Sequence, residues 1–344
     1  MGTVVAIGLD IAKSVFQVHG VDEGGSVVVR RRLTRAKVLS FFAQLPSCLV
    51  GLEACATAHH WGRELTKLGH DVRLMPPSYV KAYLKRQKND AADAEAICEA
   101  VTRPSMRFVP IKSPEQQSVM SIHRVRQTLM RQRVQMSNAI RGHLGEFGLV
   151  APIGRNGLAQ LIGLVSSPTQ DHVPAEVRTA VLMLATQLHL VNEQILELDR
   201  SIKASAKASE VGRRLMEVPG VGPLVASALV ATIADPKSFK SGRNLAAWIG
   251  LVPRQNSSGG KERLGGITKR GDRYLRQMLV VGALSVIRYA QRHGTKRPWL
   301  VQLLARRSTK ISAVAMANKM ARMIWAIMTT GERYREPLPL PAAA

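Results

Sequence analysis

The hydrophobic pattern of the first hundred residues alternates between the two-residue repeat of strands and the 3.6-residue repeat of helices. Three short apolar or alternating runs predict strands at 4–10, 14–19 and 26–32, and Asp22-Glu-Gly-Gly25 predicts a hairpin turn between the last two. The later elements alternate: the expected helices are 35–45, 59–68, 78–86 and 90–101, and the expected strands are 48–53 and 71–75. Three meandering strands followed by β-α-β crossovers predict a mixed sheet with helices on its faces.

The remainder of the chain has a helical repeat. Apolar residues at helical spacing fill 114–146 and 174–209, and two such amphipathic helices joined by a turn predict an antiparallel hairpin, either a spacer or a dimerisation arm. Five further helices are expected at 224–233, 244–248, 274–292, 299–305 and 311–328. The Gly- and Ser-rich segment 256–261 predicts a loop between them.

These patterns predict three domains and a tail. Residues 1–112 form an α/β domain, 113–210 a helical coiled-coil spacer, 211–336 a mainly α C-terminal domain, and 337–344 a disordered tail. A length of 344 residues suits two to three domains of ~100–200 residues each. The apolar fraction of 46% is ample for packed cores.

The charge is unevenly distributed. The formal net charge is +25, and residues 211–344 hold 23 basic and 6 acidic residues, a net charge of +17. Residues 1–110 hold 15 basic and 10 acidic residues, a net charge of only +5. Solubility alone does not require so lopsided a ratio. We therefore expect a polyanion partner, by default nucleic acid, bound mainly by the C-terminal region.

Other compositional features exclude several classes of protein. Three cysteines do not make a disulfide scaffold, and the N-terminus lacks the basic and cleavage regions of a secretory signal. No apolar run is long enough to span a membrane, so we expect a cytoplasmic protein with no membrane partner. Cys55, His59 and His60 lack a fourth ligand at zinc-site spacing. An aromatic content of 4% argues against a platform that stacks many bases.

Four carboxylates of the first domain are expected to converge. Asp10 ends the first strand, Glu53 ends the fourth, and Asp90 and Asp93 share one face of the last helix. Considered singly, Asp90 could be an N-cap, Asp93 a partner of the helix dipole and Glu53 a salt-bridge residue. Together they would repel one another unless a cation neutralised them, and Mg²⁺ suits such oxygen ligands. Two such ions could bind a phosphodiester and stabilise both the attacking and the leaving oxygen.

Two segments of the C-terminal region are candidates for phosphate binding. Pro219-Gly-Val-Gly222, which includes Gly220 and Gly222, lies between helical segments and resembles a helix-hairpin-helix, whose backbone N–H groups can hold a nucleic-acid phosphate without reading bases; a plain helix connection is the alternative. Ser257 and Ser258 precede two glycines within a cationic segment, where a serine could become a nucleophile on phosphorus or simply belong to a loop. The basic residues of this segment are Arg254, Lys261, Arg263, Lys269, Arg270, Arg273 and Arg276.

The order of elements and acids resembles a ribonuclease H-like fold of the RuvC-like type. The DEDD exonucleases have the same number of acids, but their first motif is Asp-x-Glu, whereas this chain has Asp10-Ile-Ala12. The sugar kinase and actin-type ATPases also begin with Gly-x-Asp, but they need a second phosphate loop that the later sequence lacks.

Five motifs in order across nearly the whole chain resemble the transposases of the insertion sequence 110 family, within which the chain is most similar to the 1111 subgroup. They are GLDIAKS, LEA around Glu53, NDAADAEA, VPGVG and the block GLVPRQNSSGGKERLGGITKRGDRYLR. Asp10, Glu53, Asp90 and Asp93 match the family's DEDD pattern. Ser258, which directly precedes Gly259, best matches its catalytic serine, with the adjacent Ser257 as the alternative.

The resemblance implies a DNA recombinase of an insertion sequence that cuts and exchanges strands through a serine–phosphate intermediate, with Mg²⁺ at the acids. It implies donor DNA, target DNA and a structured bridge RNA as partners. The expected assembly is a homo-oligomer, a dimer that becomes a tetramer when active. Because about 165 residues separate the acids from the serine, they could act within one chain or between two.

Two other functions remain open from the sequence. A RuvC-like nuclease would cut DNA junctions with water, and its serine loop would be structural. A nucleic-acid-binding protein without catalysis would have a decayed site, but the complete set of four acids argues against it.

Overall fold

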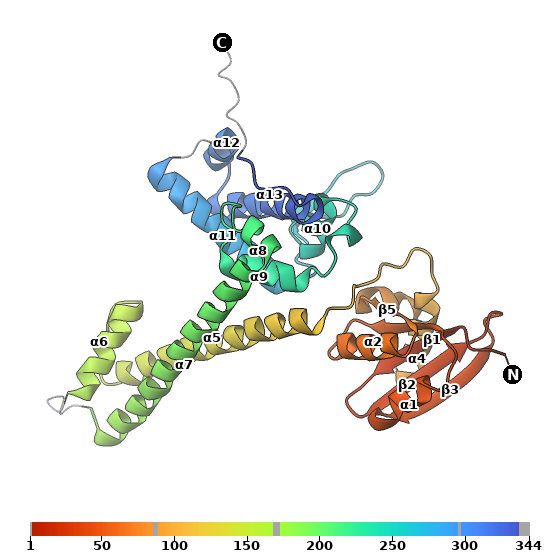
Figure 1. The fold of residues 1–344 in the computed structure, drawn as a ribbon. Helices are drawn as coiled ribbons and strands as arrows, with labels where there is room; N and C mark the ends of the chain where they lie inside the picture. The colour runs from red at the N-terminus through yellow and green to blue at the C-terminus, as the bar shows by residue number, and fades with distance from the viewer. Residues whose placement is uncertain (1, 85–88, 168–172, 295–296, 337–344) are drawn as a thin grey trace, which may run out of the picture. The chain divides into compact units, whose positions relative to one another are not determined.

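The structure is a computed structural model that describes residues 2–84, 89–167, 173–294 and 297–336. The chain divides into two compact units, Met1–Pro114 and Glu115–Ala344, each with its own hydrophobic core (Figure 1). The expected tail, 337–344, lies outside the described residues. None of the described helices combines the length and apolar character needed to cross a bilayer.

The first unit contains the expected mixed sheet. Its strands are β1 (Ala6–Ile11), β2 (Val15–Val21), β3 (Val27–Thr34), β4 (Leu49–Glu53) and β5 (Asp71–Met75), and their order in the sheet is β3-β2-β1-β4-β5. β1 pairs antiparallel with β2 and parallel with β4, so the meander and the crossover part meet at β1. The prediction that the first and fourth strands are neighbours is confirmed, and the carboxyl ends of β1 and β4 lie side by side.

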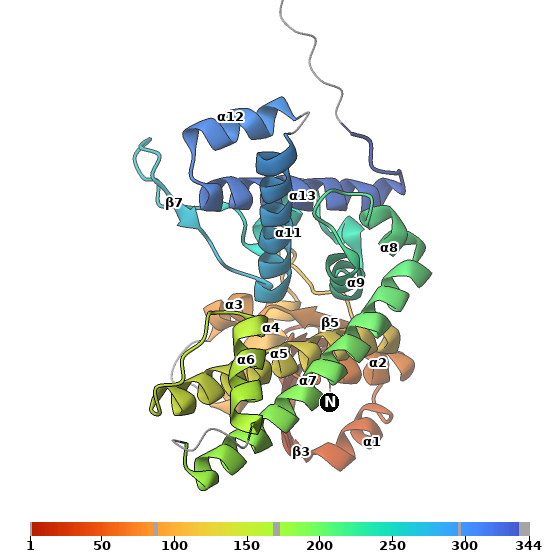
Figure 2. The same ribbon diagram turned by 90° about the vertical axis from the view of Figure 1, so that its left-hand side faces the viewer.

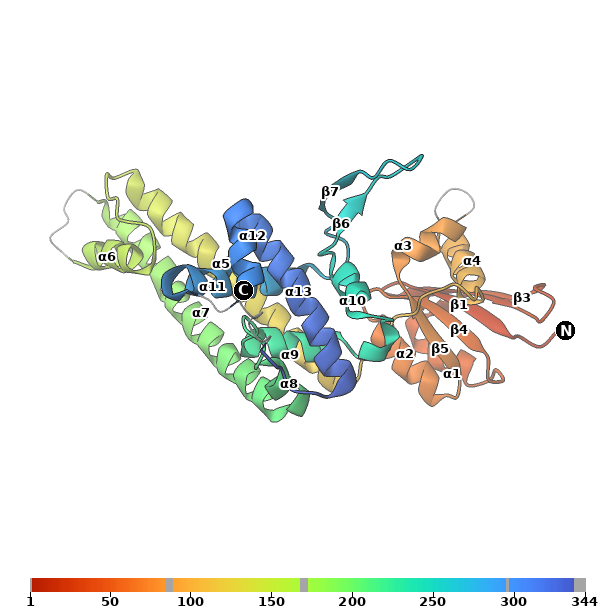
Figure 3. The same ribbon diagram turned by 90° about the horizontal axis from the view of Figure 1, so that it is seen from above.

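Helices cover both faces of this sheet (Figure 3). The helices α1 (Val38–Phe42) and α2 (Ala58–Lys67) bury Phe42, Trp61 and Leu65 against one face. The helix α4 (Asp90–Val101) packs on the other face, where β1 and β4 each contribute a glycine. A Cβ at Gly51 would lie only 2.7 Å from the Cβ of Val101, so the absence of side chains allows this close approach.

One predicted helix of the first unit is wrong. The described part of the predicted helix 78–86 is not continuous: a single helical turn, α3 (Pro77–Val80), passes into the 3₁₀ turn η2 (Lys81–Tyr83), and Leu84 is already extended. Residues 85 and 86 lie outside the described residues. The predicted helix 35–45 is likewise a 3₁₀ turn, η1 (Arg35–Lys37), followed by the short helix α1. Short amphipathic patterns do not distinguish one helical turn from several.

The described part of the second unit is mostly helical. Its helices are α5 (Pro114–Gly145), α6 (Arg155–Ser166), α7 (Ala175–Ala208), α8 (Glu210–Leu215), α9 (Pro223–Thr232), α10 (Gly242–Ile249), α11 (Arg273–His293), α12 (Pro298–Arg306) and α13 (Thr309–Thr330). The main core of the unit lies among α8 to α13, with Leu279, Ala317 and Ile324 fully buried. The expected helical C-terminal region is therefore confirmed.

The two long helices α5 and α7 cross (Figures 1 and 2), and the connection between them is not the simple turn that the sequence predicts. Arg126 of α5 pairs with Asp199 of α7 at 2.5 Å between Nε and Oδ1. The connection contains α6, which the sequence analysis missed because glycines and Pro152 surround it. Leu161 and Val165 nevertheless bury themselves against Ile140 of α5, which accounts for the helix.

Candidate functional site

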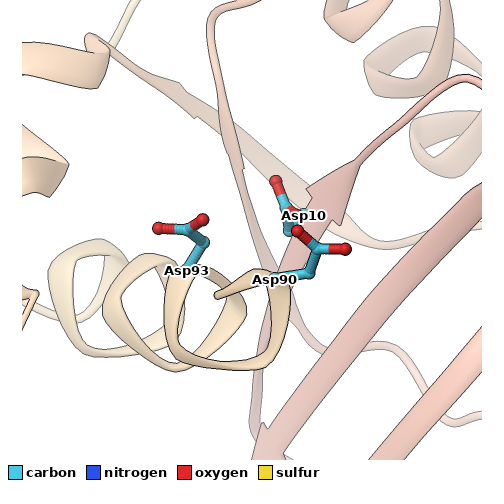
Figure 4. Close-up of side chains that lie close together, drawn as sticks. All are labelled: Asp10, Asp90 and Asp93. Atoms are coloured by element: carbon cyan, nitrogen blue, oxygen red, sulfur yellow. The ribbon is translucent and has the colours of Figure 1, made fainter. Parts of the chain in front are cut away.

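Three of the four predicted acids converge in the first unit. Asp10, Asp90 and Asp93 each offer a carboxylate oxygen, and these three oxygens lie within 4.8 Å of one another. Figure 4 shows Asp10 at the end of β1 and the other two on the first turn of α4. Asp10 and Asp93 are half-buried, whereas Asp90 is exposed. The side chains thus meet at the surface, where a phosphate could reach them.

Local structure determines where the acids lie. α4 passes directly over β1 because position 8 is glycine: a Cβ there would lie 2.1 Å from the carbonyl oxygen of Ala94. The N-cap of α4 is Asn89, whose side-chain oxygen accepts a hydrogen bond from the N–H of Ala92 at 2.8 Å. Asp90 is therefore not the cap, and its carboxylate is available for another role. Asn before the Ala-rich run could have been recognised as a cap from the sequence.

Glu53 lies next to this group without joining it. Leu9 of β1 pairs in register with Leu52 of β4, so Asp10 and Glu53 take adjacent positions at the carboxyl ends of two parallel strands. The pKa of the Cys55 thiol is raised mainly by burial and, to a smaller extent, by the nearby carboxylates of Glu53 and Asp10. Within the described residues, the carboxylates close enough to share one ion are the three aspartates, and Glu53 is their neighbour.

The three aspartates fit a hard divalent cation. Two unit negative charges 4.8 Å apart repel by on the order of 3 kcal/mol at an effective dielectric constant of about 20. The N-terminus of α4 carries a partial positive charge that offsets only part of this repulsion. Carboxylate oxygens are the ligands that Mg²⁺ and similar ions prefer, and one or two carboxylates commonly suffice when phosphate oxygens complete the shell.

His59, Cys48 and Cys98 of the first unit have structural environments. His59 Nδ1 accepts a hydrogen bond from the backbone N–H of Lys112 at 3.2 Å, and its other ring nitrogen lies 3.4 Å from Lys112 Nζ. Cys48 and Cys98 are buried free thiols. Among the residues that the structure describes, the aspartate group is the one cluster of acids, histidines or cysteines close enough to hold a metal ion.

The serines lie on a β-hairpin that the sequence analysis expected to be a loop. β6 (Pro253–Gln255) pairs with β7 (Leu264–Ile267), and the hairpin projects from the helices of its unit (Figure 2). Gly259 and Gly260 both have positive φ, 55° and 73°, and Lys261 donates its N–H to the carbonyl of Ser258. These are the features of a two-residue turn, for which a Gly-Gly pair is a recognised signal.

The two serines differ in their surroundings. Ser257 Oγ accepts a hydrogen bond from the N–H of Arg263 at 3.1 Å, so this hydroxyl helps to hold the two arms of the hairpin together. Ser258 begins the turn and is exposed. The geometry therefore gives Ser257 a structural contact and leaves Ser258 at the exposed tip.

The predicted basic residues fall into two groups. Those with exposed side chains on the hairpin and the segment that follows it are Arg254, Lys261, Arg263, Lys269, Arg270 and Arg273. Arg276 is half-buried, and its Nη1 donates to the carbonyl oxygens of Ile249 at 2.7 Å and Arg270 at 3.1 Å. Arg276 thereby fastens the base of the hairpin to the end of α10. The sequence could not distinguish this arginine from its neighbours.

The Pro219–Gly222 turn connects α8 and α9 as expected. Gly220 has a φ of 87°, and a Cβ there would lie 2.8 Å from the carbonyl oxygen of Gly282 in α11, so packing against α11 by itself accounts for the glycine. Gly222 is exposed and directly precedes α9. Gly222 is thus the more accessible of the two glycines.

Comparisons with known proteins cover nearly the whole chain. A family profile described as "Transposase IS116/IS110/IS902 family" matches residues 212–297, and a DEDD transposase profile of IS110 elements, described as "Transposase", matches residues 7–148. A Pseudomonas aeruginosa protein named "Probable family 20 transposase" is 50% identical over 96% of this chain and 98% of its own length.

Two further relatives are named for their mobile elements. The transposase for insertion sequence element IS1111A of Coxiella burnetii is 40% identical over 97% of this chain and 92% of its own length. The transposase for IS1328 of Yersinia enterocolitica is 38% identical over 96% of this chain and 98% of its own length. The chain therefore belongs to the IS116/IS110/IS902 family of insertion-sequence transposases, which are DNA recombinases.

Proposed function

We propose that the chain is an RNA-guided, Mg²⁺-dependent transposase that cuts and exchanges DNA strands through a covalent serine–phosphate intermediate. The observation that best supports this proposal is the convergence of Asp10, Asp90 and Asp93 within 4.8 Å at the carboxyl end of β1, the central strand of the sheet. The exposed Ser258 among cationic side chains supports the covalent step. The proposed place of action is the bacterial nucleoid.

Each residue has a proposed role. Asp10, Glu53, Asp90 and Asp93 would hold Mg²⁺, which when bound supplies Lewis-acid polarisation of a phosphate oxygen. The Oγ of Ser258 forms a bond to phosphorus while the bond from phosphorus to a deoxyribose oxygen breaks, and the released strand end takes up a proton. Because one phosphoester replaces another, the later attack by a strand hydroxyl needs no external energy source.

The cationic side chains of the hairpin would stabilise the transition state. Arg254, Lys261 and Arg263 belong to the same short hairpin as Ser258 and are exposed, so they can neutralise charge that develops on the phosphate. The N–H groups at the start of α9, near Gly222, would bind a neighbouring phosphate without reading bases. Sequence choice would then rest with a bridge RNA that pairs with donor and target DNA.

The covalent intermediate provides the test. We would incubate the full-length protein with end-labelled element DNA, Mg²⁺ and RNA transcribed from the non-coding segment beside the gene, and then separate the products under denaturing conditions. The expected product is a protein–DNA adduct whose peptide map assigns the DNA to Ser258. Cutting by the Ser258→Ala variant without any adduct would identify a nuclease that uses water. Unchanged products from Asp90→Asn and Asp93→Asn would indicate that the acids have no catalytic role.

A mixing experiment tests whether the acids and the serine act between copies in the proposed homo-oligomer, a dimer or tetramer. Ser258→Ala and Asp10→Asn proteins would be inactive alone. Recovered activity in the mixture would mean that one copy supplies the acids and another the serine. No recovery at any ratio would count against action between copies.

A further inference from the structure

A cationic groove lies beside the aspartate group in the first unit. The groove has a volume of about 360 Å³, and its lining includes Gln17, His19, Arg30, Arg32, Asn89 and Glu95. We infer that this groove binds the phosphodiester backbone of the DNA strand that is cut, a few nucleotides from the reacting phosphate. The inference rests on the proposed function: the occupant of the groove is identified as the cut DNA because the groove lies close to the acids that are proposed to act on that DNA.

The sheet register aligns the groove with the acids. Asp10 pairs with Gln17 of β2, and Gln17 pairs with Arg32 of β3. Gly8 pairs with His19 and His19 with Arg30 in the next row. Since a Cβ at Gly8 would point at α4, both rows lie on the face of the sheet that α4 covers. The row Asp10, Gln17 and Arg32 is therefore a continuous line of polar residues from the acid group to the edge strand β3.

The dimensions suit a nucleic-acid strand. Arg32 is two strands away from Asp10, which corresponds to about 10 Å at the usual spacing of neighbouring strands. Phosphates of one B-DNA strand advance by about 3.4 Å per nucleotide along the helix axis and are farther apart through space, so this span covers at most about three nucleotides. A strand whose phosphate lies at the aspartates could thus place a second phosphate beside the arginines.

The charges of the groove favour a polyanion. Arg30 is 67% exposed and lies 4.0 Å from the carboxylate of Glu95, itself 40% exposed, so this contact is weak and a phosphate can compete for the guanidinium. Within the described part of the chain no ion pair involves Arg32, which is exposed on the edge strand. Two guanidinium groups with their planar donor forks match phosphate oxygens well.

The chemistry of the lining favours backbone contacts with DNA over base reading or a separate RNA site. None of the described residues that line the groove is Phe, Tyr or Trp, and the ring of His19 is buried, so stacked bases are not expected there. The groove also extends from the first turn of α4, which bears Asp90 and Asp93. The lining residues Asn89 and Ala91 flank Asp90 in the chain, so a strand that leaves the groove over this turn reaches the acids, which under the proposed function act on the DNA that is cut.

The first test measures the salt dependence of DNA binding by the full-length protein. Each phosphate neutralised by a cation contributes roughly 0.9 to the slope of log affinity against log salt. The Arg30→Ala/Arg32→Ala variant should lower this slope by about two, so the loss of affinity between 50 and 200 mM salt becomes about tenfold smaller. The control Lys37→Ala/Lys67→Ala removes the same charge from exposed positions outside the groove and should not have this effect. Equal slopes for the two variants would overturn the inference.

The second test identifies the polymer by cross-linking. In a Cys55→Ser background, Arg32→Cys should form a disulfide with element DNA that carries a thiol tether on a phosphate three nucleotides from the cut. Lys37→Cys should not. A cross-link to tethered guide RNA instead of DNA, or none to DNA while strand cutting persists, would overturn the inference. A DNA cross-link in a protein that forms no serine adduct would support the groove while refuting the proposed covalent chemistry.

Discussion

Gly8 and Ala94 lie so close that no side chain fits between their backbones. A Cβ at position 8 would lie 2.1 Å from the carbonyl oxygen of Ala94 and 2.4 Å from the backbone nitrogen of Cys98. This contact brings the first turn of α4 over the end of β1. The distance between Asp10 and its two partners on α4 therefore depends on a residue that has no side chain.

The Gly8→Ala variant tests this dependence. We expect the free energy of unfolding to fall by about 1–3 kcal/mol, as for other overpacked cores, because backbone atoms must move. Strand cutting should fall further than stability alone explains, since α4 moves away from Asp10. The control is Gly24→Ala, whose Cβ would meet nothing closer than 3.5 Å. Equal effects of the two variants on cutting would contradict the argument.

The sequence predicts the first unit well because its strands are short, apolar and separated by strong turn signals. The expected strand 71–75 and helix 90–101 coincide with β5 and α4. The adjacent positions of Asp10 and Glu53 follow from topology, since β1 and β4 are parallel neighbours in the sheet. The glycine contacts of α4 could not be predicted, because they depend on how a helix packs rather than on a local pattern.

The cap of α4 provides a second prediction. Asn89→Ala removes the hydrogen bond to the N–H of Ala92 and should destabilise the protein by about 1 kcal/mol. The first turn, with Asp90 and Asp93, should then fray. Hydrogen exchange at the amides of Ala92 and Asp93 should accelerate, and Asn89→Ser should restore protection. If Asn89→Ser exchanges as fast as Asn89→Ala, capping is not the cause.

His123 joins α5 to the helices of the C-terminal core. Its ring nitrogens lie 2.9 Å from Tyr274 Oη and 3.1 Å from Ser227 Oγ, and the residue is buried. Burial, and to a smaller extent the charge of Arg126, lowers the pKa of His123 to about 4. The native protein therefore holds a neutral imidazole, whereas the unfolded chain takes up a proton near pH 6.5.

The free energy of unfolding should consequently vary with pH in the acid range. Between pH 6.5 and about 4 the unfolded state binds more protons at this residue, so the free energy of unfolding falls as the pH is lowered, by at most about 3 kcal/mol. His123→Gln can make hydrogen bonds but cannot titrate. Urea unfolding from pH 4.5 to 7.5 should show a shallower pH dependence for this variant than for the wild type. If the free energy of unfolding has the same pH dependence in the wild type and in His123→Gln, then His123 is not the source of that dependence.

Arg273 and Arg276 should behave differently despite their proximity. Arg276→Ala loses two charge-assisted hydrogen bonds to backbone carbonyls and should destabilise the protein by about 2 kcal/mol. Arg273 is exposed, so Arg273→Ala should leave stability unchanged and lower the salt slope of DNA binding by about one. Unfolding curves and salt titrations of both variants distinguish the roles. Identical results for the two arginines would contradict them.

The C-terminal unit is less predictable than the first. Its helices are recognisable from their repeat, but the hairpin around Ser258 lacks the alternation of apolar residues that marks strands. Only Gly259-Gly260 indicates the turn. The fixed position of Arg276 depends on carbonyl oxygens at the end of α10, which is distant in sequence, so composition could only group this residue with the exposed arginines.

Metal binding by the aspartate group tests the account most directly. Calorimetric titration of the full-length protein with Mg²⁺, and electron paramagnetic resonance with Mn²⁺ as a probe, would compare the wild type with Asp10→Asn and Asp93→Asn. The control Glu99→Gln removes a carboxylate of the same helix that pairs with Arg103. We predict saturable binding in the wild type and in the control, and loss of that binding in both aspartate variants. Equal binding in all four proteins would contradict the central claim.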